Sequence, residues 1–179
     1  MTKLYRYLKI KDVDLLYFFN HRLQKDFLDP IMMIITQLGS FGFALSLPLI
    51  LICSRSYRVH SLGLSLAIGL FCSSLIVFAI KIAFQRPRPC AMFEDIRARL
   101  IPKDKNSFPS GHTCAALTIS VILAQSLPNS ISYAFIALGV LVGISRMYLG
   151  VHYPSDVLFG GCIALITSLK LVPLLIVIF

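Results

Sequence analysis

Residues 145–156 read SRMYLGVHYPSD and separate two long apolar segments of the chain. The stretch contains Arg146, His152 and Asp156. Ionisable groups beside membrane segments are costly to bury, so a cluster of this kind is a candidate functional site. The alternative is that Arg146 and Asp156 mark helix ends and that His152 is a polar loop residue. This stretch alone does not distinguish the two interpretations, so the rest of the sequence is needed to choose between them.

The amino-acid composition predicts a membrane protein. The chain has 179 residues, of which 57% are hydrophobic and 14% are charged, and its mean hydropathy is +0.81. These values are typical of membrane proteins, and the length predicts a single domain, residues 1–179. The net charge of +9 fits anionic headgroups or a phosphorylated substrate better than nucleic acid, because most of the chain is apolar. Residues 1–11 are polar and basic, so no signal peptide is expected.

The N-terminal segment, residues 1–27, predicts a short helix at the membrane interface. Residues 12–23 mix aromatic with charged side chains, and they are too short and too polar to cross a bilayer. We therefore expect an amphipathic helix that lies along the interface, with His21 as a solvated surface residue.

Uncharged runs predict the first two transmembrane helices. Residues 30–54 and 61–80 contain no charged side chain, and each run is long enough for one span. Gly39 and Gly42 would allow a bend or close packing within the first of them.

The C-terminal half predicts three further spans. Residues 113–145 are uncharged but too long for one helix, and residues 127–130 (LPNS) interrupt them with a turn. A fifth span starts within residues 157–167, and Lys170 would mark its far interface. Residues 171–179 either continue this span or lie along the surface. The expected fold class is an all-α integral membrane bundle of about five transmembrane helices plus the interfacial helix.

Alternating crossings place two polar segments on the same membrane face. Residues 81–112 connect the second and third spans, and residues 145–156 connect the fourth and fifth. Pro87 and Pro89 prevent the second span from continuing into its polar connection. Connections of this length are usually functional or disordered, and we interpret both segments as parts of an active site.

Three clusters of reactive side chains occur in these segments: Lys81 with Arg88, the run Ser110-Gly111-His112, and Arg146 with His152 and Asp156. Separately, each has a structural explanation, such as an interfacial lysine or a helix cap. Together they supply three cations, a helix N-terminus, two histidines and a carboxylate. That set of groups is suited to binding and transferring a phosphoryl group.

The spacing of these residues resembles the three-part motif of the type 2 phosphatidate phosphatase superfamily. The matching positions are Lys81-x6-Arg88-Pro89, Pro109-Ser110-Gly111-His112 and Ser145-Arg146-x5-His152-x3-Asp156. The superfamily contains lipid phosphate phosphatases, bacterial phosphatidylglycerophosphate and undecaprenyl diphosphate phosphatases, soluble acid phosphatases and vanadium haloperoxidases. Many bacterial members have six spans, whereas this sequence predicts five.

The resemblance implies a role for each matching residue. His152 would be the nucleophile that forms a phosphohistidine, Asp156 would hold its tautomer, and His112 would act as general acid and then as general base. The residues implied in phosphate binding are Lys81, Arg88, Ser110, Gly111 and Arg146. The resemblance implies no cofactor.

Residue chemistry agrees with these roles independently. Gly111 has no side chain where the backbone would approach an anion, and His112 opens a helix whose positive end would face the substrate. His152 and Asp156 are about one helical turn apart, and Pro154 suits the first turn of a helix. Cationic neighbours would favour the neutral form of His152, which a nucleophile needs.

The polar residues have other possible roles, which their chemistry does not favour. Two separated histidines and one carboxylate among three cations make a poor divalent-cation site, so no metal is expected. Arg86 lies close to the phosphate-binding cations but is not a motif position, and its role is open. Tyr148 and Tyr153 are predicted to be interface aromatics rather than catalysts.

The leading functional hypothesis is metal-independent hydrolysis of a lipid phosphate or diphosphate. Phosphatidate, phosphatidylglycerophosphate and undecaprenyl diphosphate are the candidate substrates, and Gly111 favours phospholipid phosphates because related undecaprenyl phosphatases often carry Asp there. The alternative is a non-catalytic lipid-phosphate binder or transporter, which would not need both histidines and the aspartate. A haloperoxidase is disfavoured because the known ones are soluble and much larger.

The charge distribution predicts the orientation in a bacterial cytoplasmic membrane. Arg55, Arg58 and Lys170 lie on the face opposite the active-site segments, which favours an outward-facing site. The basic N-terminus favours the reverse. Because many charges on the active-site face would be catalytic, we expect the site to face outward.

Overall fold

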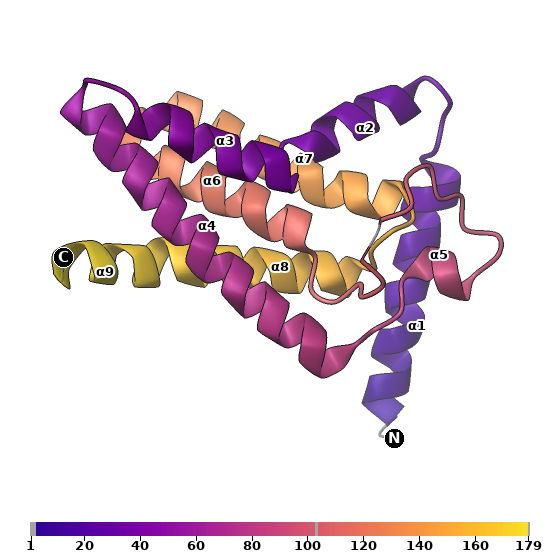
Figure 1. Cartoon of the computed structure of the whole chain (residues 1–179). Coiled ribbons are helices and arrows are strands. Elements are labelled where there is room, and N and C mark those ends of the chain that lie inside the picture. The colour runs from indigo at the N-terminus through magenta and orange to yellow at the C-terminus, as the bar shows by residue number, and fades with distance from the viewer. Residues whose placement is uncertain (1–2, 103, 179) are drawn as a thin grey trace.

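The computed structural model describes residues 3–102 and 104–178, and within them the chain is a bundle of helices without a β-strand (Figure 1). The elements in chain order are α1 (Lys3–Tyr17), the π-helix η1 (Phe18–Arg22), α2 (Leu28–Gln37), α3 (Phe41–Ile52), α4 (Tyr57–Phe84), α5 (Pro89–Met92), α6 (Gly111–Ser126), α7 (Asn129–Tyr148), α8 (Pro154–Ile166), the π-helix η2 (Thr167–Leu171) and α9 (Val172–Ile178). The predicted all-α fold class is confirmed.

The N-terminal helix starts earlier than predicted. We expected it over residues 12–23, whereas α1 begins at Lys3 and continues into η1 up to Arg22. Residues 3–11 contain no glycine or proline and are rich in long side chains that favour helix, so nothing interrupts the helix before Asp12. Figure 1 shows α1 crossing one end of the bundle beside the start of α8. Its position at a membrane interface stays a prediction.

The first predicted span is divided into α2 and α3, whose axes meet at 49°. Gly39 lies at the break, where a Cβ atom would collide with the backbone carbonyl of His112. Ser40 then starts α3, and its Oγ accepts a hydrogen bond from the N–H of Phe43 at 3.3 Å. The predicted bend is therefore present at Gly39. Gly42, in contrast, faces open space.

Replacing Gly39 by alanine is expected to destabilise the fold by about 1–3 kcal/mol, because the added methyl group overpacks the contact with His112. Gly42→Ala is the matched control and is expected to change stability by less than about 0.5 kcal/mol. Thermal unfolding of the detergent-solubilised variants measures the difference. Equal midpoints for the two variants would contradict the close approach at Gly39.

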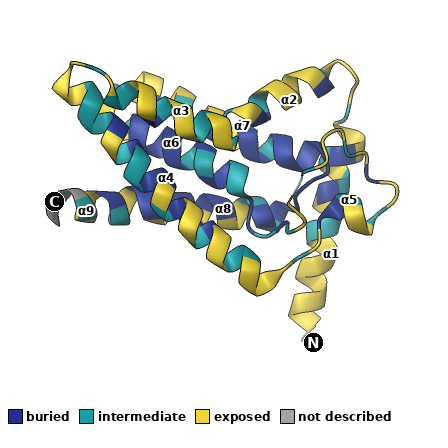
Figure 2. Cartoon of the chain, viewed as in Figure 1, coloured by how far each residue is buried: buried dark blue, intermediate teal, exposed yellow. Residues whose placement is uncertain are grey.

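Helix α6 lies at the centre of the bundle, as Figure 2 shows by its largely buried surface. It packs between α4 and α7. On the α4 side, Leu66 and Leu70 join Ile119 and Ile122 in one apolar cluster. On the α7 side, Gly139 lets the two helices approach closely against Ser120 of α6. Small residues of this kind are common where membrane helices pack together.

The described helices support fewer spans by length than the five predicted. Three helical segments are long and apolar enough to cross a membrane: Tyr57–Phe84, Asn129–Tyr148 and Pro154–Leu175. The bent pair α2–α3 adds a fourth if it counts as one span. Helix α6 has 16 residues and is about 24 Å long, and its central position surrounds it with protein.

The last helix continues beyond the residue that was expected to mark its end. Helix α8 passes through η2 into α9 without a turn, so residues 171–178 extend the span rather than leave it. Lys170 is exposed and lies inside this continuous helix, not at its end. Phe179 lies outside the described residues.

The two predicted active-site segments meet at the same end of the bundle, as the alternating crossings require (Figure 1). The backbone N–H of Ser110 donates to the carbonyl of Asp156 at 2.9 Å, which joins the start of α6 to the start of α8. Gly160 makes this approach possible, because a Cβ atom there would lie 2.5 Å from the carbonyl oxygen of Ser110.

Candidate active site

His152 lies on the short turn between α7 and α8 and is almost completely buried. Gly150 makes this turn with a φ of +70°, a conformation that disfavours side chains. A Cβ atom at Gly150 would also lie 2.6 Å from Ile96 and 3.0 Å from Asn20. The turn is therefore held from outside by other segments, and the glycine allows them to pack against it.

The contacts of His152 define which ring nitrogen carries the proton. Nη1 of Arg88 lies 3.1 Å from Nε2 of His152, and a guanidinium group can only donate. Nε2 is therefore the acceptor, and the proton lies on Nδ1. That atom faces Oδ2 of Asp156 at 3.4 Å and has no closer hydrogen-bond partner among the described residues. The free electron pair of the imidazole thus points toward an arginine.

The surroundings of His152 keep its imidazole neutral. Burial lowers the pKa of His152 well below its ordinary value, and the nearby charges of Arg146, Arg88 and Lys81 lower it further. A neutral imidazole keeps the electron pair on Nε2 available for attack on an electrophile.

Asp156 is fixed on both carboxylate oxygens in the first turn of α8. Oδ2 accepts a hydrogen bond from the backbone N–H of Tyr153 at 2.9 Å and so caps the helix. Oδ1 accepts one from Nη1 of Arg86, also at 2.9 Å. Pro154 occupies the first helical position, where its missing N–H costs little. The carboxylate is therefore held between the helix start and the imidazole of His152.

Arg88 and Lys81 share a carboxylate that the sequence did not single out. Nζ of Lys81, in the last turn of α4, donates to Oδ2 of Asp104 at 2.5 Å. Nε of Arg88 donates to the carbonyl of Asp104 at 2.7 Å, and its Nη2 lies 3.4 Å from Oδ2. Asp104 thus offsets part of the positive charge of the two cations. Burial raises the pKa of Asp104, but the hydrogen bonds from Lys81 and from the N–H of Asn106, together with the charges of Lys81 and Arg88, lower it by more, so its pKa lies below the ordinary value.

Arg146 is buried near the end of α7 and is held by the bent first span. Its Nη1 donates to Oγ1 of Thr36 on α2 at 2.8 Å. Its Nε is buried and has no hydrogen-bond partner among the described residues. A buried guanidinium N–H without a partner is costly, and a bound anion would satisfy it.

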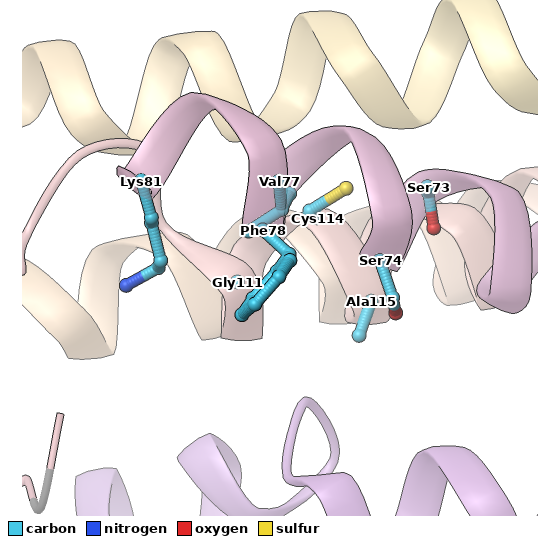
Figure 3. A pocket seen from close by; sticks show the side chains of 8 residues that line it. All are labelled: Ser73, Ser74, Val77, Phe78, Lys81, Gly111, Cys114 and Ala115. Atoms are coloured by element: carbon cyan, nitrogen blue, oxygen red, sulfur yellow. The ribbon is translucent and has the colours of Figure 1, made fainter. Parts of the chain in front are cut away.

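Ser110 and Gly111 open α6 in different ways. Oγ of Ser110 accepts a hydrogen bond from the N–H of Thr113 at 3.4 Å and is 2.9 Å from Oγ1 of Thr113, so this hydroxyl caps the helix. Its predicted contact with phosphate stays a prediction. Gly111 lines a cavity of about 150 Å³ between α4 and α6, with Lys81 at one end and Phe78 along its side (Figure 3).

His112 lies in the first turn of α6, at the positive end of the helix. It is half-buried, and the positive charges of Arg146, Arg88 and Lys81 lie close enough to act on its ring. The predicted site residues from both polar segments are therefore brought to one end of the bundle.

A polar network holds the long connection between α5 and α6 in place. Asn20 of η1 is completely buried, and its amide donates to the carbonyls of Tyr148 and Arg97 while accepting from the N–H of Arg97. Nε of Arg99 pairs with Asp29 of α2 at 2.7 Å. This connection is consequently packed against the ends of α7 and η1.

Two aromatic predictions are wrong. Tyr148 is buried, and its hydroxyl donates to Asp29 at 2.7 Å, so it braces α2 against α7. Tyr153 is buried beneath the guanidinium of Arg86, which lies 3.7 Å from the centre of its ring. Neither is exposed as a membrane-interface aromatic would be. His21, in contrast, is exposed and stacks on Tyr17, as predicted for a surface residue.

Four residues beside the site were missed or left open from the sequence: Asp12, Thr36, Arg86 and Asp104. Arg86 had been noted for its proximity to the cations, but only the structure connects it to Asp156. Asp12 lies in a helix of mixed polarity, and nothing in the sequence distinguished it from neighbouring charges. In the part of the chain that the structure describes, no three His, Cys, Asp or Glu side chains gather as a metal site.

Comparison with known proteins identifies the family. The family model described as the PAP2 superfamily matches residues 58–175. The chain is 35% identical over 143 residues to the undecaprenyl-diphosphatase BcrC of Bacillus subtilis, covering 78% of this chain and 70% of that protein. Relatives of this kind are lipid phosphate or diphosphate phosphatases.

Solved structures agree in fold. Aquifex aeolicus LpxE matches with a TM-score of 0.77 at 29% identity, over 88% of this chain and 92% of that one. A transmembrane PAP2 type phosphatidylglycerolphosphate phosphatase from Bacillus subtilis matches with a TM-score of 0.72 at 28% identity, over 96% and 86%. The apolar helices of this chain and its similarity to a transmembrane phosphatase together show that it is an integral membrane protein. The chain, with the motif residues of both polar segments inside the matched region, belongs to the PAP2 superfamily.

Proposed function

We propose that this protein, as a single membrane-embedded domain, hydrolyses the phosphate or diphosphate group of a membrane lipid through a phosphohistidine on His152. The observation that carries the proposal is the orientation of one imidazole. Nε2 of His152 faces the guanidinium of Arg88, while Nδ1 faces the carboxylate of Asp156. This is the tautomer of a nitrogen nucleophile placed beside a group that binds phosphate.

The reaction proceeds in two balanced steps. Nε2 of His152 attacks phosphorus, and the bond from phosphorus to the leaving oxygen, of the lipid or of its inner phosphate, breaks as protonated His112 donates its proton to that oxygen. Water then attacks phosphorus as the now neutral His112 accepts a proton from it, the bond between phosphorus and Nε2 of His152 breaks, and inorganic phosphate leaves. Asp156 stabilises the positive charge of the phosphorylated imidazole through Nδ1. Lys81, Arg88 and Arg146 stabilise the charge on the phosphoryl oxygens, and the proposed reaction needs no metal ion.

The cavity between α4 and α6 supports a lipid as the substrate. It runs from Lys81 past Val77 and Phe78, so a charged end meets an apolar wall (Figure 3). A phosphorylated headgroup would lie at the Lys81 end, while the attached chain would follow α4 toward the bilayer. The names of the relatives, an undecaprenyl-diphosphatase and a phosphatidylglycerolphosphate phosphatase, support substrates of this class.

The experiment is phosphate release from a lipid panel by the purified protein in detergent containing EDTA. Phosphatidate, phosphatidylglycerophosphate and undecaprenyl diphosphate are compared at equal lipid fractions. We expect turnover of at least one of them, with a preference for phospholipid phosphates in view of Gly111. Loss of turnover in EDTA would contradict the proposed metal independence. A non-catalytic binder would retain lipid and release no phosphate.

The site is proposed to face outward from a bacterial cytoplasmic membrane. The support is the basic far-face loop with Arg55 and Arg58, as the positive-inside rule requires. Labelling of single cysteines, placed at Ser56 and at Glu94 in intact cells, tests the orientation. Modification of the Ser56 variant by an impermeant reagent, without modification of the Glu94 variant, would reverse it.

A further inference from the structure

Arg86 connects the N-terminal helix to the carboxylate beside the nucleophile. It lies between Gln85, which ends α4 with a φ of +43°, and the first proline of the polar connection. Its Nη1 donates to Oδ1 of Asp156 at 2.9 Å and to Oγ of Ser155 at 2.7 Å. Its Nη2 donates to Oδ2 of Asp12 at 2.7 Å. None of these contacts reaches the cations assigned to phosphate binding.

Asp12 of α1 completes this arrangement from the other side. Its Oδ1 accepts the backbone N–H of Ser155 at 2.8 Å, and its Oδ2 accepts the hydroxyl of Ser155 at 2.6 Å. The side chain of Asp12 is 11% exposed, and that of Asp156 is completely buried. Arg86 therefore bridges two shielded carboxylates, with the ring of Tyr153 under its planar face.

The two oxygens of Asp156 divide their tasks. Oδ2 faces the imidazole of His152 and takes the N–H of Tyr153, so Oδ1 depends on Arg86 for its charged partner. A buried carboxylate that loses its cation binds a proton more readily, and a protonated Asp156 would no longer orient and stabilise His152. The contact from Arg86 to Oδ1 and the contact from the N–H of Tyr153 to Oδ2 together fix the direction of the carboxylate plane.

We propose that Arg86 and Asp12 are positioning residues for the pair Asp156–His152, so that helix α1 forms part of the catalytic support. This inference rests on the proposed function of the same site. Arg86 keeps Asp156 ionised and directed at Nδ1 of His152, and Asp12 keeps Arg86 in place. Neither residue binds the substrate phosphate.

Steady-state kinetics of Arg86→Gln and Asp12→Asn test the proposal. Arg86→Gln is expected to lower kcat by about 10²-fold and to change KM by no more than about twofold. Losses of this size occur in metalloenzymes when a residue that hydrogen-bonds to a metal ligand is replaced. Asp12→Asn is expected to lower kcat by about 10-fold. The double variant should be no worse than Arg86→Gln, because both changes break one connection. The acid limb of the pH profile for kcat should move to higher pH in Arg86→Gln, since Asp156 protonates more easily.

Arg99→Gln is the matched control. Arg99 and Asp29 form an ion pair of 2.7 Å, the same length as the pair between Arg86 and Asp12, but this pair does not contact Asp156. The control should retain kcat and the wild-type pH profile. If Arg86→Gln retains kcat within twofold, or loses it with an unchanged pH profile and the same loss of thermal stability as Arg99→Gln, Arg86 is only a structural link and the proposal is wrong.

A wild-type protein that releases no phosphate from any lipid would overturn the proposed function. The effect of Arg86 on His152 can still be measured in that case, because its measurement does not depend on activity. The imidazole nitrogen signals of His152 in an isotope-labelled sample report which ring nitrogen carries the proton. Arg86→Gln should reduce the Nδ1–H form, whereas Arg99→Gln should not. Unchanged signals in both variants would overturn the positioning proposal independently of activity.

Discussion

Replacing His152 by alanine is expected to lower lipid phosphate release by about 10⁶-fold, the loss that removal of the nucleophile causes in a serine protease. Without Nε2 the proposed covalent intermediate cannot form, whereas Arg88, Arg146 and Lys81 should still bind the phosphate. Lipid binding should therefore persist while turnover disappears. Single-turnover assays with radiolabelled lipid phosphate measure both quantities in the same sample.

The control for this experiment is His21→Ala, since His21 is exposed, stacks on Tyr17 and lies outside the site. It should retain full turnover. Quenching the wild-type reaction should trap a protein-bound phosphate that is labile in acid and stable in alkali, and His152→Ala should trap none. Full activity of His152→Ala, or equal labelling of both proteins, would rule out the proposed nucleophile.

Replacing Arg88 by alanine is expected to cost about 10³-fold in kcat/KM, because one side chain makes several contacts with different segments of the site. Its Nη1 reaches both the carbonyl of Val151 and Nε2 of His152, and its Nε reaches the carbonyl of Asp104. A lysine at this position supplies a charge but not a planar group with donors in two directions. Arg88→Lys should therefore recover little of the lost activity.

Arg97→Lys is the comparison variant for this prediction. Arg97 is exposed and lies 3.8 Å from Asp26, away from His152, so its exchange for lysine should leave kcat/KM unchanged. The unfolding temperature of Arg88→Lys separates a local loss of catalysis from a loss of fold. Recovery of wild-type activity by Arg88→Lys would show that charge alone is needed at this position.

The parts of the fold that could be predicted depend on local patterns. Uncharged runs located the main helices, the turn at 127–130 separated α6 from α7, and counting crossings brought residues 81–112 to the same end as residues 145–156. These features follow from composition and chain order, which the bilayer makes decisive. The early start of α1 was missed, and the helical continuation past Lys170 was one of two alternatives left open, because terminal boundaries depend on weak propensities.

The supporting residues of the site could not be predicted, because their partners are distant in the chain. Arg86 meets Asp12 and Asp156 from helices at opposite ends of the sequence, and Thr36 meets Arg146 only because α2 bends away from α3. Tyr153 was predicted to be an interface aromatic because the side chain of tyrosine has an apolar ring with a polar hydroxyl at its tip. Its burial under Arg86 is decided by tertiary packing, which a single sequence does not record.

The carboxylate of Asp104 changes what binding means at this site. Lys81 and Arg88 are already paired with the carboxylate of Asp104. In the proposed reaction, a phosphate that binds to these two cations would therefore have to replace this carboxylate. The net free energy of phosphate binding is then the difference between the interaction of the two cations with phosphate and their interaction with the carboxylate of Asp104. A doubly charged phosphate competes better for the cations than a singly charged one. In the proposed reaction this replacement would run backward after hydrolysis: Asp104, tethered by the chain, would return to the cations at a high effective concentration and help to release inorganic phosphate.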